Sequence, residues 1–267
     1  MATAKGASYL HRVVTVPNAF RAEEDTVGAA DLARRTGMPK STVHRITAAL
    51  ADEGLLERHG SGVRLGLRLF ELGERVPRRR VLRDAALPYM ADLHEATRQT
   101  VHLAVLEGTE VVYMEILAAP GGPPLTSRVG GRLPAHTTGV GKAVLAFSPP
   151  EAVRAVLDGD LPRLSERSLV APGLLAREPA RIRRAGVAYD REESMPGVVC
   201  AAGPVLGPGG ECLGALSVTG WSGRMRLDRV SPAVHTAAPA LSRTLGHRDG
   251  TPGHERSGER GSRRAAP

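Results

Sequence analysis

The chain has 267 residues, of which 42% are hydrophobic and 24% are charged, values typical of a globular protein with room for two domains. Its apolar runs are shorter than the roughly 18 residues of a membrane helix, and its N-terminal segment lacks the pattern of a secretory signal. Its two cysteines are too few for a disulfide framework. We therefore expect a cytoplasmic protein with reduced thiols and no membrane partner.

The formal net charge is +8, and it is unevenly distributed. Residues 1–80 contain 14 Lys and Arg against 9 Asp and Glu, a net of +5, whereas residues 81–247 contain 17 against 16. A basic module joined to a neutral one favours a polyanion such as nucleic acid as partner of the first module. The alternative is that arginine is simply abundant in this chain.

Residues 8–20 predict a first helix that is broken or kinked near Pro17, because proline removes a backbone donor and clashes with the preceding turn. Residues 26–56 predict two further helices with a tight break between them. In the first of these, the apolar residues at helical spacing are Ala30 and Ala33, with Leu32 as a further candidate. Gly37 suits the left-handed cap of that helix, and Pro39 suits the start of the next.

The second of these two helices has one apolar stripe, formed by Val43, Ile46 and Leu50. Its opposite face is polar and basic toward the N-terminal end, the end that a recognition helix presents to base edges in the major groove. We expect DNA contacts from this face, at Lys40, Ser41, Thr42, His44 and Arg45.

Residues 55–66 predict a short hairpin around a Gly-Ser-Gly turn. Arg58 and Arg64 flank this turn and are placed to contact the DNA backbone as the wing of a winged helix. Residues 8–68 therefore predict a winged helix-turn-helix DNA-binding domain. A winged helix that binds protein and carries a solvated basic face is the alternative.

Residues 69–82 predict a linker helix, punctuated by Pro77 and the run Arg78–Arg80. Residues 83–247 then predict an α+β domain of the sensor type. We expect a helix to residue 97, a hairpin over 100–117, a third strand over 123–129, a helix after residue 139 and a helix over 149–157. A helical segment with a break at Pro179, a strand over 187–193, a long hairpin over 198–220 and a closing helix from 227 follow. The tail, residues 248–267, has almost no apolar content and is expected to be disordered.

The stretch "HTTGVGKAVLAF", residues 136–147, resembles a phosphate-binding loop in its Gly-x-Gly-Lys turn before an apolar helix. A P-loop needs a glycine at position 136 and a hydroxyl at 143, but these positions hold His136 and Ala143. Glycines at 139 and 141 still leave backbone amides bare at a helix N-terminus, which suits a small carboxylate. Lys142 is expected to be solvated or paired, with Glu192 or Glu193 as its partner, and direct ligand contact is the alternative.

Other chemistry has weaker support. His102, His136 and Cys200 lack the tight spacing of metal ligands, and no Gly-x-Ser-x-Gly elbow accompanies the serines and histidines. We expect no enzyme activity, no cofactor and no metal. A metal- or thiol-responsive DNA-binding regulator remains the alternative.

Five motifs in order carry a family resemblance: "DLARRTGMPKSTVHRITAALADEGLL", "VRLGLRLFELG", "GGRLPAHTTGVGKAVLA", "AGVAYDREESMPGVVCAAGPV" and "LGALSVTG". Over about residues 8–247 the chain resembles the IclR-type bacterial transcriptional regulators. The resemblance implies a winged helix-turn-helix joined by a linker helix to a GAF/PAS-like effector-binding domain. It also implies a homodimer or dimer of dimers on double-stranded operator DNA. The effector-site positions that it implies are Leu133, Gly139, Val140, Asp190, Cys200, Ser217 and Thr219.

The chemistry of these positions narrows the expected effector. Ser217 and Thr219 are two apart on a strand, so their hydroxyls share a face. Asp190 can accept a hydrogen bond from a ligand hydroxyl but would repel a second carboxylate. We therefore expect a ligand-responsive transcriptional regulator, acting as a repressor, whose effector is a small hydroxy- or oxo-acid.

Overall fold

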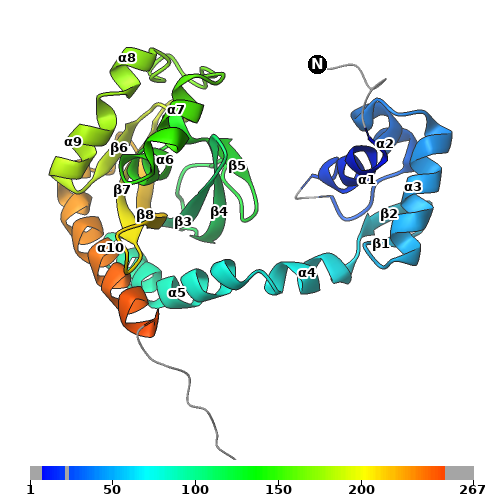
Figure 1. Cartoon of the computed structure of the whole chain (residues 1–267), viewed down its shortest axis with the longest axis horizontal. Coiled ribbons are helices and arrows are strands. Elements are labelled where there is room, and N and C mark those ends of the chain that lie inside the picture. Colours follow the sequence, from blue (N-terminus) through cyan, green and yellow to red (C-terminus); the bar gives the residue numbers. More distant parts are fainter. Residues whose placement is uncertain (1–7, 22–23, 250–267) are drawn as a thin grey trace, which may run out of the picture. The chain divides into compact units, whose positions relative to one another are not determined.

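The computed structural model describes residues 8–21 and 24–249 (Figure 1). The chain forms two compact units, Met1–Val81 and Leu82–Pro267. The boundary between them falls inside one helix, α5 (Pro77–Thr97). From residue 250 on, the tail that the sequence predicts to be disordered lies outside the described residues, whereas residues 248 and 249 belong to α10 (Leu227–Asp249).

The N-terminal unit contains, in order, α1 (Tyr9–Asn18), α2 (Ala29–Thr36), α3 (Lys40–Asp52), β1 (Leu56–His59), β2 (Gly62–Leu65) and α4 (Leu67–Glu74). Helix α1 ends at Asn18, directly after Pro17, as predicted. Gly37 has φ of +67° and ends α2 in the left-handed conformation that glycine adopts without strain. The winged helix-turn-helix architecture is confirmed.

The core of this unit is formed where α1, α2 and α3 meet. Val16 of α1, Leu32 of α2 and Val43 and Ile46 of α3 are all buried. Ala30, expected on the apolar face of α2, is exposed, because that face is centred on Leu32 and Ala33 instead. Strands β1 and β2 pair antiparallel, and Val27 adds an isolated bridge to Val63.

The single linker helix predicted over 69–82 is wrong in its bounds. Helix α4 ends at Glu74, and α5 begins at Pro77 and runs without a break to Thr97. Pro77 explains the restart, because proline at the first helical position loses no intrahelical hydrogen bond.

The C-terminal unit is built on a six-stranded sheet in the order β5-β4-β3-β8-β7-β6, in which all neighbours are antiparallel. The strands are β3 (Thr100–Glu107), β4 (Glu110–Leu117), β5 (Arg132–Pro134), β6 (Ala188–Arg191), β7 (Val198–Leu206) and β8 (Cys212–Trp221). The remaining helices are η1 (Ala135–Thr137), α6 (Gly139–Ala146), α7 (Pro150–Leu157), α8 (Pro172–Leu175) and α9 (Glu178–Ala185). Both predicted hairpins and the α+β class are confirmed.

The sheet separates two apolar clusters. Helices α5 and α10 pack on one face, where Leu216 and Val218 of β8 join their core. Helix α6 packs on the other face, against Ala202 of β7 and Ala215 of β8. Because strand side chains alternate between faces, Ser217 and Thr219 point toward α6.

Two predictions for this unit concern the third strand and the helix break near Pro179. Residues 123–129 form a loop and no strand, so the third strand is β5 at Arg132–Pro134. Two successive prolines at 123 and 124 remove ladder donors from that segment. The break expected near Pro179 is confirmed: α8 ends at Leu175, and Pro179 lies in the first turn of α9.

Within the described ranges, no helix is long and apolar enough to cross a membrane.

Candidate functional site

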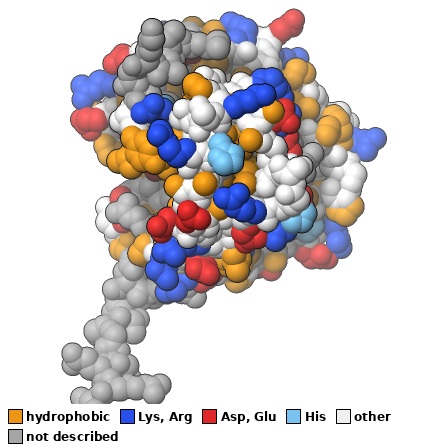
Figure 2. Space-filling model, turned by 90° about the vertical axis from the view of Figure 1, so that its right-hand side faces the viewer, with side chains coloured by type: hydrophobic (Ala, Val, Ile, Leu, Met, Phe, Trp, Pro, Cys, Tyr) orange, Lys and Arg blue, Asp and Glu red, His pale blue; other side chains and the backbone are white. Residues whose placement is uncertain are grey.

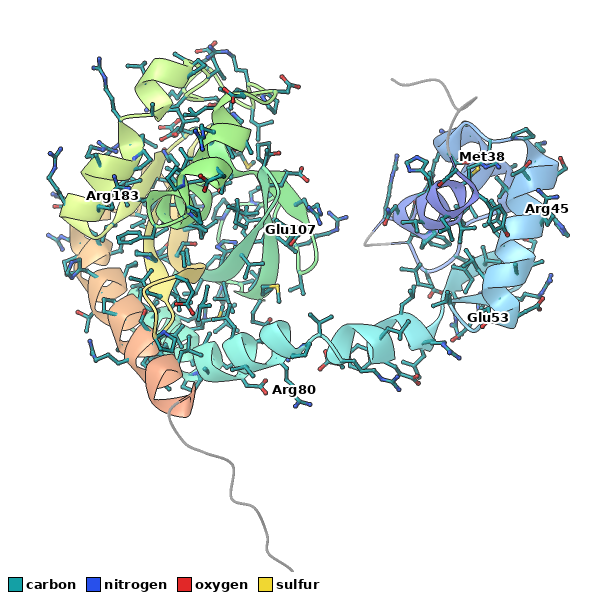
Figure 3. All side chains as sticks on the ribbon, in the orientation of Figure 1. Met38, Arg45, Glu53, Arg80, Glu107 and Arg183 are labelled. Carbon is teal, nitrogen blue, oxygen red and sulfur yellow. The ribbon has the colours of Figure 1, made fainter. Side chains whose placement is uncertain are left out.

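The polar face of α3 is open to solvent. Lys40, Ser41, His44 and Arg45 are exposed, and Thr42 is half-buried. Figure 3 shows Arg45 pointing away from the body of its unit. Figure 2, which views this side of the molecule, shows Lys and Arg side chains spread over its surface. This is the surface that a recognition helix needs, with cations and donors clear of the apolar core.

The two wing arginines differ in their surroundings. Arg58 is exposed, whereas Arg64 pairs with Glu57 across the β1–β2 ladder, with Nη2 2.7 Å from Oε2. This contact lowers the pKa of Glu57 and raises that of Arg64. Because Arg64 is already paired with Glu57, we expect Arg58 to contact a DNA phosphate more strongly than Arg64 does.

A pocket lies between α6 and the face of the sheet that α6 covers. Pairing across the strands places its polar groups side by side: Asp190 opposes Cys200, Cys200 opposes Thr219, and Ser217 opposes His102. Directly opposed residues share one face of a sheet. One face therefore carries a carboxylate, a thiol, two hydroxyls and an imidazole toward α6.

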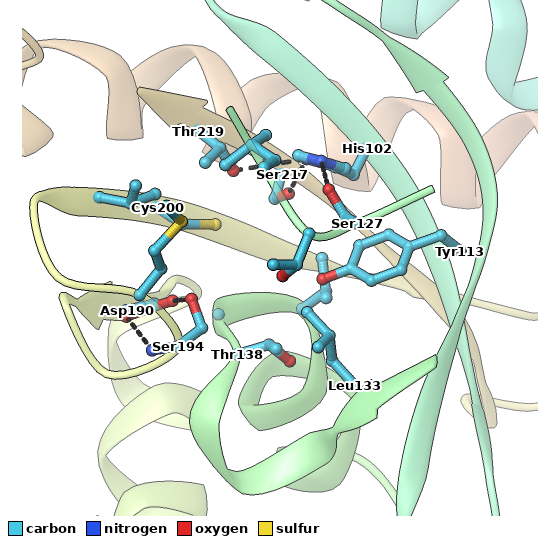
Figure 4. Close-up of a pocket in the computed structure, with 16 residues that line it drawn as sticks. His102, Tyr113, Ser127, Leu133, Thr138, Asp190, Ser194, Cys200, Ser217 and Thr219 are labelled. Carbon is cyan, nitrogen blue, oxygen red and sulfur yellow. Dashed lines mark hydrogen bonds between the residues drawn. The ribbon is translucent and has the colours of Figure 1, made fainter. Parts of the chain in front are cut away.

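All seven positions that the resemblance implies line this one pocket (Figure 4). The cavity is small, about 30 Å³. Because that volume is on the scale of water molecules, a larger ligand requires side chains to move. The lining residues that the sequence analysis did not assign to it are His102, Tyr113, Leu125, Thr126, Ser127, Thr138, Ser194, Met195 and Val198.

The N-terminus of α6 forms one wall. Thr138 caps the helix by accepting the backbone N–H of Gly141 at 3.0 Å. The backbone N–H groups of Gly139 and Val140 donate to no other described residue, as expected for the first positions of a helix. Two bare amides at the positive end of a helix dipole suit a carboxylate.

Both glycines of this turn are required by close packing. A Cβ at Gly139 would lie 2.9 Å from Sγ of Cys200, and a Cβ at Gly141 would lie 2.2 Å from the carbonyl oxygen of Ala135. The glycines that first suggested a phosphate loop therefore let α6 approach the sheet and η1.

Asp190 both lines the pocket and holds the turn that follows β6. Its carboxylate accepts the hydroxyl of Ser194 at 2.5 Å and the backbone N–H of Glu193 at 2.6 Å. Burial raises the pKa of Asp190 to about 6, because the charged form is poorly solvated there. The pocket therefore holds a carboxylate that titrates near neutral pH.

Lys142 does not line this pocket. It forms a buried ion pair with Glu193, one of the two partners predicted, with Nζ 2.5 Å from both carboxylate oxygens. Glu192 pairs with Arg167 instead. Lys142 therefore fixes the position of α6 against the turn after β6, and the ion pair is structural.

His102 and Tyr113 form another wall. Nε2 of His102 lies 2.9 Å from Oγ of Ser127, and its Nδ1 lies 3.4 Å from the hydroxyls of Ser217 and Thr219. Burial lowers the pKa of His102 to about 4, so the imidazole is neutral at physiological pH. The ring of Tyr113 packs at a tilt against it, with centroids 5.2 Å apart.

The structure gives no support to the metal or thiol chemistry considered above. Within residues 8–21 and 24–249, no three His, Cys, Asp or Glu side chains gather as metal ligands. His136 lies away from the pocket, with Nε2 3.1 Å from the carbonyl oxygen of Pro162. Burial raises the pKa of Cys200 to about 12 and that of Cys212 to about 11, so neither thiol is a ready thiolate.

The sequence contained a signal for Tyr113 that was missed. Regular pairing from the turn after Glu107 sets Tyr113 opposite Ala104, which is two residues from His102 and on the same face. For residues 125–127 the sequence gives no such pairing signal. They are predicted as a strand, whereas they form a loop that lines the pocket.

Comparison with known families gives two matches that together span most of the chain. The model described as "IclR helix-turn-helix domain" matches residues 10–60. The model described as "Bacterial transcriptional regulator IclR C-terminal" matches residues 75–243. The chain belongs to the IclR family of bacterial transcriptional regulators. The resemblance drawn from the five motifs is thereby confirmed.

Individual IclR-family proteins align along most of their length. The HTH-type transcriptional regulator KdgR of Escherichia coli (strain K12) is 31% identical over 85% of this chain and 89% of its own. The HTH-type transcriptional regulator BhcR of Paracoccus denitrificans (strain Pd 1222) is 33% identical over 79% of this chain and 78% of its own.

Solved structures agree in fold. An IclR homolog from Microbacterium hydrocarbonoxydans, complexed with 4-hydroxybenzoate, is 33% identical with a TM-score of 0.81 and covers 89% of this chain and 99% of its own. The Thermotoga maritima IclR is 26% identical with a TM-score of 0.72 and covers 89% of this chain and 98% of its own.

Proposed function

We propose that this IclR-family chain is a ligand-responsive repressor that binds operator DNA and is controlled by a small hydroxy- or oxo-acid. The carrying observation is the pocket, in which two bare amides of α6 and the hydroxyls of Ser217 and Thr219 face one small cavity. Such a site can hold a carboxylate and a neighbouring hydroxyl or carbonyl group.

Two relatives support the details of this proposal. The Microbacterium homolog binds 4-hydroxybenzoate, which is a hydroxy acid. The E. coli relative named transcriptional repressor IclR is 29% identical over 77% of this chain. On these grounds we extend acid sensing and repression to this chain, in the cytoplasm, and we propose regulation rather than catalysis.

DNA binding is assigned to the N-terminal unit. Lys40, Ser41, Thr42, His44 and Arg45 of α3 would enter the major groove, while Arg58 and, more weakly, Arg64 would meet the backbone. We propose that a homodimer or dimer of dimers binds, since such motifs read paired half-sites. Apolar side chains left exposed on α1 and α4, such as Leu10 and Phe70, support association with a second copy.

A mobility-shift assay on the DNA upstream of the chain's own gene tests the first part. We expect a shift that excess unrelated DNA does not abolish. A thermal-shift screen of small organic acids tests the second part, because a ligand that binds only the folded state raises the melting temperature. Tighter binding of neutral or cationic metabolites than of every acid would overturn the acid assignment.

A further inference from the structure

One hydroxyl that faces the pocket makes no hydrogen bond within the described part of the chain. The side chain of Tyr113 is 5% exposed, and its hydroxyl makes no hydrogen bond with any described residue. Figure 4 shows this oxygen pointing into the pocket. Because this oxygen is not among the fully buried unpaired atoms of the described residues, it is open to the pocket, and a ligand group that enters can form a hydrogen bond with it.

The side chains packed against Tyr113 are uncharged, and Asp190, across the pocket, only adds to the effect of burial in raising the pKa of Tyr113. His102, which packs against its ring, is neutral because burial lowers the pKa of the imidazole to about 4. Burial also raises the pKa of Tyr113, so its hydroxyl keeps its proton and remains a donor. Ser127, whose hydroxyl lies 2.9 Å from Nε2 of His102, is neutral as well.

The charged groups lie elsewhere. Figure 4 shows Asp190 and Ser194 at the opposite end of the pocket from Tyr113, and Gly139 of α6 lies beside Asp190, with its Cβ position 3.5 Å from the backbone nitrogen of that residue. Lys142 is paired with Glu193 and does not line the pocket. A second charge at the Tyr113 end would therefore be buried without a counter-ion, which is strongly unfavourable.

We propose that Tyr113 and His102 determine specificity by recognising an uncharged hydrogen-bonding group on the effector, at the end away from its carboxylate. The effector class is therefore a monocarboxylic acid with a distal hydroxyl or carbonyl, and dicarboxylic acids are rejected. This inference rests on the proposed acid-binding function and specifies which acids the same pocket accepts.

Two matched sets of acids test the proposal by calorimetry on the full chain. One set is 4-hydroxybenzoate, benzoate and terephthalate, and the other is 4-hydroxybutyrate, butyrate and succinate. In at least one set we expect the hydroxy acid to bind roughly tenfold more tightly than the acid lacking the hydroxyl. The dicarboxylate should bind more weakly than either.

The variant Tyr113→Phe removes only the hydroxyl. It should reduce the affinity for the hydroxy acid to that for the unsubstituted acid, and measurable binding of the unsubstituted acid shows that the pocket is intact. Tyr189→Phe is the matched control, because Tyr189 packs under Arg191 and does not line the pocket. It should keep the wild-type preference.

These experiments distinguish an error in the specificity assignment from an error in the proposed acid sensing. If the wild type binds acids but Tyr113→Phe keeps the preference, or if a dicarboxylate binds as tightly as the hydroxy acid, the specificity assignment is wrong and acid sensing stands. If no acid in either set binds, both acid sensing and this inference are overturned.

Discussion

Lys142 and Glu193 form an ion pair almost out of reach of solvent, with side-chain exposures of 1% and 8%. The pair joins the first turn of α6 to the turn after β6, which is also held by Asp190. The wall of the effector pocket formed by bare amides is thus anchored by a contact that lies outside the pocket.

Removing one member of this pair should destabilise the fold strongly. Lys142→Ala leaves Glu193 buried without a counter-ion, and we expect a loss of about 3–5 kcal/mol in the free energy of unfolding, measured by urea denaturation. The double variant Lys142→Met with Glu193→Gln should recover much of that loss. Arg98→Ala, in an exposed pair with Glu95, serves as control and should change little. If Lys142→Ala and Arg98→Ala lowered the free energy of unfolding equally, the buried pair would contribute no more to stability than the exposed one.

Gly139 is predicted to tolerate no side chain while the pocket keeps its shape. Gly139→Ala places a Cβ 2.9 Å from Sγ of Cys200, so α6 must shift away from the sheet and acid binding should weaken at least severalfold in calorimetry. Adding Cys200→Ala should restore part of the affinity. Gly173→Ala, where a Cβ would meet nothing, is the control. Unchanged binding by Gly139→Ala would place the carboxylate elsewhere.

Acid binding should strengthen as pH falls through the titration of Asp190. Since burial raises the pKa of Asp190 to about 6, its charge is present at about pH 7.5 and mostly absent at about pH 5.5. An effector carboxylate stays ionised over this range, so its repulsion by Asp190 disappears at the lower pH and its dissociation constant should fall.

Asp190→Asn should flatten that pH dependence while leaving the turn capped through its amide oxygen. His102 contributes no titration there, because its pKa of about 4 lies below the range. Calorimetry at the two pH values decides the matter. Weaker binding at low pH, or the same pH dependence in the Asn variant, would contradict the assignment.

Arg45 and Arg58 are predicted to act differently on DNA. Arg45→Ala should lose preference for the operator over unrelated DNA, by about 1–3 kcal/mol of discrimination if it pairs with guanine. Arg58→Ala should weaken binding to all DNA similarly and lower the salt dependence by about one unit of slope. Arg64→Ala should have the smaller effect of the two wing variants, because Glu57 already engages Arg64. Intact operator affinity in Arg45→Ala would show that the recognition helix is misplaced.

The sequence predicts the fold where local rules act alone. Stripes at helical spacing, Gly37 at a left-handed cap and a tight turn after Glu107 are local signals, and each gave the right element. The seven pocket positions came from family motifs, and the structure gathers all of them. That they bind an effector remains a prediction.

The features that the sequence did not predict have tertiary causes. The segment 123–129 is predicted as a strand, but its prolines and the contact between Ser127 and His102 make it a loop. Arg64 is predicted as a wing cation, and its ion pair with Glu57 follows only from the hairpin register, which sets the two residues opposite each other. The raised pKa of Asp190 depends on burial by distant segments, which no local pattern encodes.

We expect acid binding in the pocket to change the affinity of the chain for DNA, and one titration measures this coupling. Fluorescence anisotropy of labelled upstream DNA gives the affinity of the full chain with and without an acid that raises its melting temperature. We expect the acid to change the DNA affinity of the wild type by at least about fivefold, and this change should be lost or reduced in Gly139→Ala. An acid that binds the chain yet leaves DNA affinity unchanged would contradict it.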